Sequence, residues 1–262
     1  MNDTTRRAVL LVALLGFAGL YVWGLQGLPP SGEYRGLYGK IINQVVVTER
    51  HATDAVTAVT FDYRGFDTLG EEFILFASVM GVAVLLRHQV EEEEDAGGER
   101  QEQREDESSA RAAPDPSAAT RVMGLVLVGI IVTFGLYVVT HGQLTPGGGF
   151  QGGVILATAP LLVYLAGNPK KFLRIAPPWL VEVGEACGAA GFVLLGLLGL
   201  VLGGLYLQNV VPLGPSDPKV TSAGTIPLIN LSTGLEVAGG FVLLLSVFLE
   251  QVLSRRAGKG RR

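Results

Sequence analysis

The chain has 262 residues, of which 48% are hydrophobic, 17% are charged and 36 are glycines, and its formal net charge is −4. Long apolar runs with many glycines are typical of a membrane protein rather than of a free-standing soluble enzyme. The single cysteine excludes an intrachain disulfide and a cysteine-based metal site, and the three histidines lack metal-ligand spacing. The composition therefore predicts no metal, no cofactor and no binding of nucleic acid.

An α-helix needs about 20 mostly apolar residues to cross a bilayer. Six segments meet this requirement, so we expect an all-α membrane protein with about six transmembrane helices. They lie at Ala8–Leu25, Thr68–Leu86, Val122–Thr140, Gly148–Ala166, Trp179–Tyr206 and Leu231–Leu253. The fourth is the least regular, because it contains Gln151 and Pro160.

The first of these segments has an alternative interpretation. Thr5, Arg6 and Arg7 precede it and faintly resemble a twin-arginine export signal. No cleavage site of small residues follows the apolar stretch, and the rest of the chain is itself membranous. We therefore expect an uncleaved anchor.

The connection before the second span carries a short apolar segment and then a charged motif. Residues 55–61 suit a helix of about ten residues, which is too short to span and is therefore expected to be re-entrant or interfacial. Carboxylates inside a membrane often mark ion or proton paths, and Arg64 is the natural partner for a neighbouring aspartate. Alternatively, Thr68 and Glu71 form a capping box, in which Glu71 only binds free N–H groups. The candidates for an ion or proton path are Asp62, Arg64, Asp67 and Glu71.

An acidic stretch separates the second and third spans. Ten acidic residues and two arginines lie between Glu91 and Glu107, a local charge of −8, so the rest of the chain sums to +4. Almost no apolar residue lies in 88–121, so we expect a disordered linker. It divides the chain into a two-span unit (1–87) and a four-span unit (122–254), with a basic tail at 255–262. Except in the Gln26–Asp67 connection, basic residues flank the spans on one side, which predicts a cytoplasmic linker and cytoplasmic termini.

A glycine-rich motif lies between the third and fourth spans. No Gly-Lys-Ser/Thr follows it, so it is not a P-loop. Glycines four residues apart favour close packing of helices, although an ordinary glycine-rich turn is an alternative. His141, before the motif, is a candidate proton relay or simply an interfacial polar residue. The candidate assembly residues are Pro146, Gly147, Gly148, Gly149, Phe150, Gly152 and Gly153.

Acidic residues also lie in the last two predicted spans. Glu182 and Glu185 share one face of the fifth span, and Glu236 lies in the sixth. Because a carboxylate in lipid costs about 2.5–3.5 kcal/mol, these groups should face protein or water. Glu185 and Glu236 are therefore further candidates for an ion or proton path. The alternatives are snorkelling to the interface and, for Glu236, a capping box with Thr233. The fifth span also carries glycines that we expect to pack closely against other subunits, namely Gly196, Gly199, Gly203 and Gly204.

Two of these motifs resemble known membrane families. The run from Thr57 to Glu71 resembles the MbhE-type unit, which is found in membrane-bound hydrogenases and at the C-terminal end of the large antiporter subunit. The runs at 145–153 and 224–237 resemble the MnhB-type subunit of Mrp/Mnh multisubunit cation/proton antiporters. The chain is similar to a fusion of the two, joined by the acidic linker.

The resemblance implies a transporter subunit, not an enzyme, in a prokaryotic cell membrane. Its partners would be other subunits of a Na⁺/H⁺ antiporter, Na⁺, H⁺ and the lipid bilayer. No lysine lies within its spans, so the main pumping channel is expected in a larger subunit. Pro146 and Phe150 match the loop motif of the MnhB-type subunit, and Asp67 and Glu71 match the motif of the MbhE-type unit. Glu185 holds a family-typical acidic position. The alternatives are a membrane-arm subunit of a hydrogenase or a complex I-like redox-driven pump, and a scaffold without ion contact.

Overall fold

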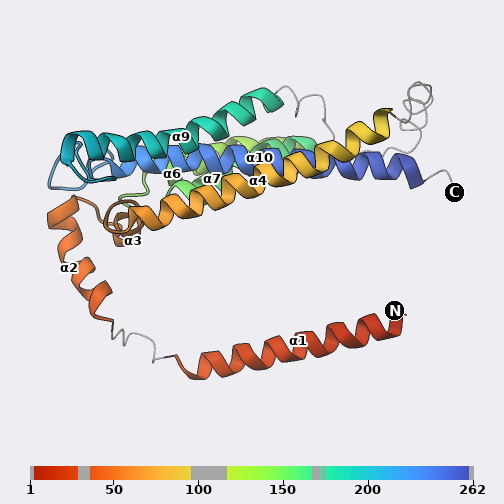
Figure 1. Ribbon diagram of the computed structural model, residues 1–262, viewed down its shortest axis with the longest axis horizontal. Helices are drawn as coiled ribbons and strands as arrows, with labels where there is room; N and C mark the ends of the chain where they lie inside the picture. The colour runs from red at the N-terminus through yellow and green to blue at the C-terminus, as the bar shows by residue number, and fades with distance from the viewer. Residues whose placement is uncertain (1–2, 29–35, 96–116, 167–171, 173–174, 260–262) are drawn as a thin grey trace. The chain divides into compact units, whose positions relative to one another are not determined.

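The computed structural model describes residues 3–28, 36–95, 117–166, 172 and 175–259. In these residues the regular structure is entirely helical, which confirms the all-α prediction (Figure 1). The elements are α1 (Asp3–Gln26), α2 (Leu37–Arg50), α3 (Ala55–Ala58), the π-helix η1 (Val59–Tyr63), α4 (Gly65–Asp95), α6 (Ala118–Thr140), α7 (Gly149–Leu165), α9 (Pro178–Gly203) and α10 (Ile226–Lys259).

The chain divides into two compact units, Met1–Ile42 and Asn43–Arg262. The first unit contains α1, whose apolar stretch Arg7–Gln26 is long enough to cross a membrane and is not buried within the chain. In the second unit α10 is the central helix, because it packs against α4, α6, α7 and α9. Its apolar stretch is 44% buried, against 22% or less for the other long apolar helices.

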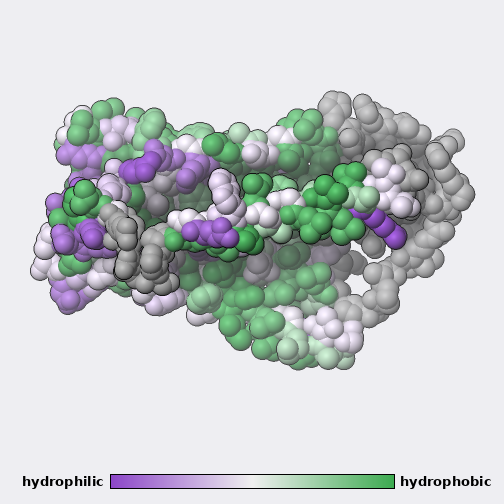
Figure 2. All heavy atoms as spheres, turned by 90° about the horizontal axis from the view of Figure 1, so that it is seen from below, coloured by the Kyte–Doolittle hydropathy of each residue, from purple (hydrophilic) through white to green (hydrophobic). Residues whose placement is uncertain are grey.

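Five of the described helices are long and apolar enough to cross a membrane, and they correspond to predicted spans one, two, three, five and six. The fourth predicted span corresponds to α7, which has 17 residues and is apolar but shorter. The exact number of spans therefore stays a prediction. Hydrophobic side chains cover much of the face shown in Figure 2, and hydrophilic ones gather at the end where α3 lies. This distribution fits a helical membrane protein.

Two helices begin earlier than predicted. α4 starts at Gly65 and α10 at Ile226, so Thr68 and Thr233 lie inside helices rather than at their N-caps. The Thr68 hydroxyl instead donates to the carbonyl of Thr60 at 2.6 Å. Both predicted capping boxes are therefore wrong, because a capping box requires its threonine at the N-cap position.

α9 ends earlier than predicted, and the chain then folds back along it. Gly204 ends the helix in the left-handed conformation, with φ of 87°. A methyl group at Gly196 would lie 2.7 Å from Cε2 of the Tyr206 ring, and one at Gly199 would lie 2.6 Å from the backbone nitrogen of Gln208. The prediction that these glycines pack against other subunits is therefore wrong for Gly196, Gly199 and Gly203, because the chain's own returning loop occupies the space beside them. It stays a prediction for Gly204, where no atom of the described residues would lie within 4 Å of an added methyl group.

The predicted linker is partly helical. α4 continues to Asp95, and α6 begins at Ala118 behind Ser117, whose hydroxyl accepts a hydrogen bond from the backbone N–H of Thr120 at 3.1 Å. Residues 88–95 and 118–121 are thus helical rather than disordered. An existing helix extends at little cost, and glutamate is a good helix former. The rest of the linker, 96–116, lies outside the described residues, and α10 extends into the predicted tail as far as Lys259.

The connection before α4 contains the short helix that the sequence predicts. α3 and η1 run without a break over residues 55–63, and Asp54 caps α3 by accepting the backbone N–H of Thr57 at 3.1 Å. Whether the segment is re-entrant or interfacial stays a prediction. α2 is not among the predicted elements, although Ile42 and Val46, four residues apart, are both buried on it.

Candidate functional site

Three glutamates from three different helices are buried in the second unit. Glu72 lies on α4, Glu185 on α9 and Glu236 on α10, and each is 1% exposed. Glu236 is close enough to interact electrostatically with both of the others, and Thr233 on α10 lies beside Glu72. We call these four residues the acid cluster.

Glu185 and Glu236 are among the residues predicted from the sequence, whereas on α4 the predicted residue is Glu71 and not Glu72. The structure leaves Glu71 exposed and buries its neighbour. Thr68, Glu72 and Val79 are each 2% exposed or less, and their spacing of four and seven residues places them on one helix face. That spacing is the signal that could have identified Glu72.

α9 and α10 approach closely because each glutamate faces a glycine of the other helix. A methyl group at Gly188 would lie 2.7 Å from Cα of Glu236, and one at Gly239 would lie 2.8 Å from the backbone nitrogen of Glu185. A methyl group at Gly240 would lie 3.2 Å from Oε1 of Glu185, so this glycine leaves room for the carboxyl group. Two Glu-x-x-Gly sequences thus place two carboxyl groups at one helix contact.

The acid cluster extends along α10, which carries two of its members and lies beside the other two. Thr233 lies beside Glu72, Glu236 comes one turn later, and Gly240 lies beside Glu185. The distance from residue 233 to residue 240 is about 10 Å at 1.5 Å per residue. Glu236 lies near the middle of the apolar stretch Ile226–Phe248. The cluster therefore extends along the direction in which α10 would cross a membrane.

The acid cluster lacks the donors that a buried carboxylate needs. Within the described residues, both carboxyl oxygens of Glu72 and Glu236, Oε1 of Glu185 and the hydroxyl of Thr233 have no hydrogen-bond partner. No ion pair identified among these residues includes the three glutamates. Because an uncompensated buried charge costs several kcal/mol, protons or a bound cation must neutralise the cluster. No three His, Cys, Asp or Glu side chains in the described ranges are arranged to hold a metal ion.

Asp62 lies apart from the acid cluster, in a polar network at the end of η1. Its Oδ2 atom forms an ion pair with Nε of Arg50 at 2.7 Å and accepts a hydrogen bond from Asn209 at 3.0 Å. Oδ1 of Asn209 accepts a hydrogen bond from the hydroxyl of Thr225 at 2.7 Å. The Arg50 guanidinium also lies 4.8 Å from the ring centre of Tyr63. This network, the polar clamp, connects the segment before α4 to the loop before α10.

The remaining charged candidates lie nearer the surface. Arg64 pairs with Asp67, as predicted, and both side chains are more than half exposed. Glu71 is exposed on α4. His141 follows the end of α6, where its ring stacks on Tyr137 with ring centres 4.2 Å apart. None of these residues lies among the four of the acid cluster.

The glycine-rich motif packs α7 between two helices of the same chain. A methyl group at Gly152 would lie 2.9 Å from the backbone nitrogen of Val139 on α6, and one at Gly153 would lie 2.8 Å from Cβ of Val237 on α10. The predicted close packing is confirmed. These contacts are made within the chain, whereas a role of the motif in assembly stays a prediction.

The start of α7 is fixed by a buried asparagine. The backbone N–H of Gly149 donates to Oδ1 of Asn230 on α10 at 2.8 Å, and Asn230 is fully buried. Gly148 precedes it with φ of 121°, which favours glycine. Pro146 is exposed and Phe150 is half-buried, so these two members of the motif remain accessible from outside the chain.

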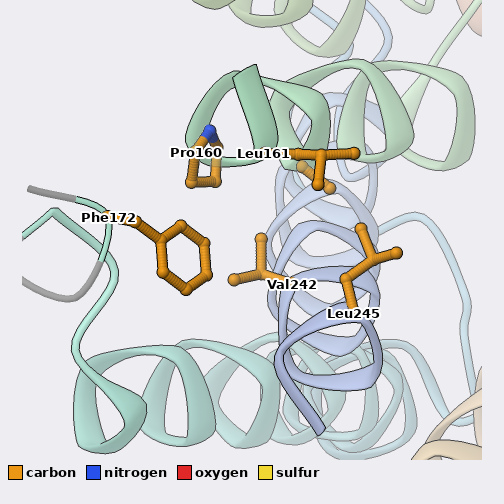
Figure 3. Close-up of a pocket in the computed structure, with 6 residues that line it drawn as sticks. Pro160, Leu161, Phe172, Val242 and Leu245 are labelled. Carbon is orange, nitrogen blue, oxygen red and sulfur yellow. The ribbon is translucent and has the colours of Figure 1, made fainter. Parts of the chain in front are cut away.

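Two recesses of the second unit have apolar linings. Figure 3 shows one between α7 and α10, where the ring of Phe172 faces Val242. A second, of about 160 Å³, lies between α9 and α10 and includes Leu180, Leu235 and Gly239 in its lining. Neither has a charged or hydrogen-bonding side chain in its lining. The acid cluster is therefore the better candidate for a functional site.

Comparisons with known proteins place residues 119–243 in the family described as a domain related to the MnhB subunit of Na⁺/H⁺ antiporter. A Staphylococcus saprophyticus protein named "Putative antiporter subunit mnhB2" is 34% identical over 138 residues, which are 51% of this chain and 90% of that protein. Protein MJ1307 of Methanocaldococcus jannaschii is 30% identical over 227 residues, 83% of this chain and 86% of that one.

Two solved structures have a similar fold. A chain of the membrane-bound sulfane sulfur reductase, an archaeal respiratory membrane complex, is 30% identical, with a TM-score of 0.68 over 94% of this chain and 98% of that chain. A chain of the Mrp complex from Dietzia sp. DQ12-45-1b is 22% identical, with a TM-score of 0.66 over 94% of this chain and 26% of that chain, and supports the fold alone. The chain belongs to the family of membrane proteins related to the MnhB subunit of Na⁺/H⁺ antiporters.

Proposed function

We propose that this chain is a membrane subunit of a multisubunit cation/proton antiporter and that the acid cluster lies on its ion or proton path. The observation that carries the proposal is the burial of three carboxyl groups inside apolar helices, where no lysine or arginine of the described residues forms an ion pair with them. Ionisable groups at such positions are costly and usually serve transport or proton relay. Membership of the MnhB-related family supports the antiporter assignment.

We also propose that residues 1–87 form an MbhE-like unit joined to the MnhB-related part. The staphylococcal protein aligns over 90% of its own length with only 51% of this chain, whereas the chain from the archaeal complex aligns with 94% of it. The difference in coverage supports a component of this chain that the staphylococcal protein lacks. The distribution of basic residues supports cytoplasmic termini in a prokaryotic cell membrane. The partners would be other antiporter subunits, Na⁺, H⁺ and lipid.

A second candidate function is that of a membrane subunit in a redox-driven ion pump. It is favoured by the similarity to a chain of the sulfane sulfur reductase complex over nearly the full length of both chains. In that case this chain would serve the same kind of ion path, while other subunits would carry the electron-transfer groups. Absorption bands of iron–sulfur clusters in the purified complex would favour this function.

The antiporter proposal can be tested in everted membrane vesicles from a host without Na⁺/H⁺ antiport activity. The vesicles would contain the complete complex or the complex without this chain, and a pH-sensitive dye would report proton flux after addition of Na⁺ or K⁺. We expect cation-dependent flux only with this chain present. Equal flux with and without the chain, in vesicles with equal amounts of the other subunits, would contradict the proposal.

A further inference from the structure

We infer that Glu72 and Glu236 share one proton and exchange it with Glu185, so that the acid cluster carries H⁺ rather than coordinating Na⁺. The inference rests on the proposed transport function and identifies the ion handled at this site. It depends on the arrangement of three buried carboxyl groups, two helix–glycine contacts and one buried hydroxyl.

Protons neutralise this cluster better than a bound cation does. Na⁺ is a hard cation that needs several oxygen ligands around one point. The groups that adjoin the three carboxyl groups on α10 instead run from Thr233 to Gly240, a helix rise of about 10 Å. The described residues contain no group of three acidic side chains, with or without His or Cys, that could surround a metal ion. A proton removes one charge where it lies and adds an O–H donor.

The facing pair explains the unpartnered oxygens. Glu72 and Glu236 are within hydrogen-bonding reach, yet as two carboxylates they offer four acceptors and no donor. One proton on either residue supplies an O–H that donates to the other. Two carboxylates in one buried site repel each other, so a shared proton stabilises the pair. The Thr233 hydroxyl can donate to the acceptor that remains.

The other charged groups near the cluster add to this effect. Glu71 of α4 repels the charge of Glu72, and Glu182 of α9 repels the charge of Glu185. No lysine or arginine forms an ion pair with the cluster among the described residues. Every identified neighbouring charge therefore favours the protonated form of the cluster.

The order of the groups along α10 defines a relay. The shared proton can move from Glu236 to Glu185, which breaks the O–H bond on Glu236 and forms one on Glu185. A further proton that enters the cluster at Glu72 then restores the shared pair. The total charge of the cluster changes only when a proton enters or leaves it. The contacts at Gly188 and Gly239 hold Glu236 and Glu185 at adjacent levels of the two helices.

Infrared difference spectroscopy of the full-length chain, in the complex with which it purifies, tests this inference. A protonated carboxyl group has a carbonyl stretching band that shifts when H₂O is exchanged for D₂O. We expect such a band at neutral pH in the wild-type protein and its loss in Glu72→Gln and in Glu236→Gln. Because one proton is shared, the double variant should lose no more of this signal than either single variant. The Glu71→Gln variant should keep the band.

Several results would overturn the inference. These are the absence of the band from the wild-type protein, its persistence in Glu72→Gln, its loss in Glu71→Gln, or its abolition by Na⁺ at constant pH. The wild-type spectra keep the inference testable even if a variant does not fold. In vesicles, Glu72→Gln should lower proton flux by on the order of 10²-fold while assembly is unchanged. A band with the expected variant pattern but without cation-dependent flux would refute the antiporter function and leave the proton site intact.

Discussion

Replacing Gly188 by alanine tests the helix contact that holds the acid cluster together. The added methyl carbon would crowd the backbone nitrogen of Glu236 and would lie 2.7 Å from its Cα and Cβ, whereas ordinary contacts begin at 3.4 Å. The helices must therefore separate locally by at least about 0.7 Å. The crowded atoms include backbone atoms, which cannot rotate away as a flexible side chain can. Overpacking of this kind costs about 1–3 kcal/mol. We therefore expect Gly188→Ala to destabilise the protein and to move Glu236 relative to its neighbours.

Gly184→Ala is the matched control on the same helix. Gly184 lies one turn before Gly188, and its added methyl carbon would meet only Cδ1 of Leu235, at 3.6 Å. Without crowding, replacing a helical glycine by alanine stabilises a protein by about 0.4–1 kcal/mol. The measurement is unfolding of both variants in the same detergent, combined with proton flux in vesicles. We expect the Gly184 variant to be at least as stable and as active as the wild type.

Equal unfolding temperatures and equal proton flux in the two alanine variants would contradict the predicted effect of crowding at Gly188. That result would mean that α9 and α10 are not in close contact at Gly188. If the Gly188 variant is destabilised but keeps normal proton flux, the result would support the packing contact and would contradict its role in positioning Glu236.

The other predictions concern the polar clamp and the start of α7. Arg50→Gln should destabilise the second unit by about 1–3 kcal/mol, because Asp62 keeps a partly buried charge without its cation, as measured by thermal unfolding. Asn230→Ala should cost about 1–3 kcal/mol in the same assay, because the backbone N–H of Gly149 loses its acceptor. Burial raises the pKa of Tyr63 from 10.0 to about 12. The contribution of this shift to the free energy of unfolding is therefore complete below pH 10.0 and is lost as the pH rises through about 12. Tyr63→Phe should reduce the alkaline loss of stability between these values.

Each of these predictions has a control or a contrary outcome. Arg64→Gln removes the cation of the pair with Asp67, whose side chains are 63% and 52% exposed, and should leave stability unchanged. An equal effect of the Arg50 and Arg64 variants would contradict the importance of burial. An Asn230→Ala protein as stable as the wild type would show that another group accepts the N–H bond. An unchanged alkaline profile in Tyr63→Phe would show that other groups dominate.

Local composition was sufficient to predict the helical class and most of the spans. A membrane-spanning helix satisfies its own backbone hydrogen bonds, so about 20 apolar residues in a row identify it without knowledge of its neighbours. The apolar residues 55–61 likewise predict a short helix that does not span, and the structure has α3 and η1 over 55–63. Helix ends were predicted less well, since the sequence offered two capping boxes and the structure uses neither.

The candidate site could be predicted only in part. The sequence identified Glu185 and Glu236 as acids inside apolar spans, yet Glu71 and Glu72 are adjacent and differ only in the helix face that they occupy. Which of them is buried depends on where α4 begins and which side packs on α10. That choice follows from helix packing rather than from local composition.

Apolar runs, glycine spacing and intramembrane acids can be read from the amino-acid order alone, and they predict membrane helices, close helix packing and sheltered carboxyl groups. The partners of those residues follow from how the helices pack. Gly152 and Gly153 pack within the chain, Gly196 accommodates Tyr206 from a returning loop, and the acid cluster combines residues from α4, α9 and α10. Burial of a charged or small side chain depends on partners distant in sequence, and these partners are fixed only when the helices pack together.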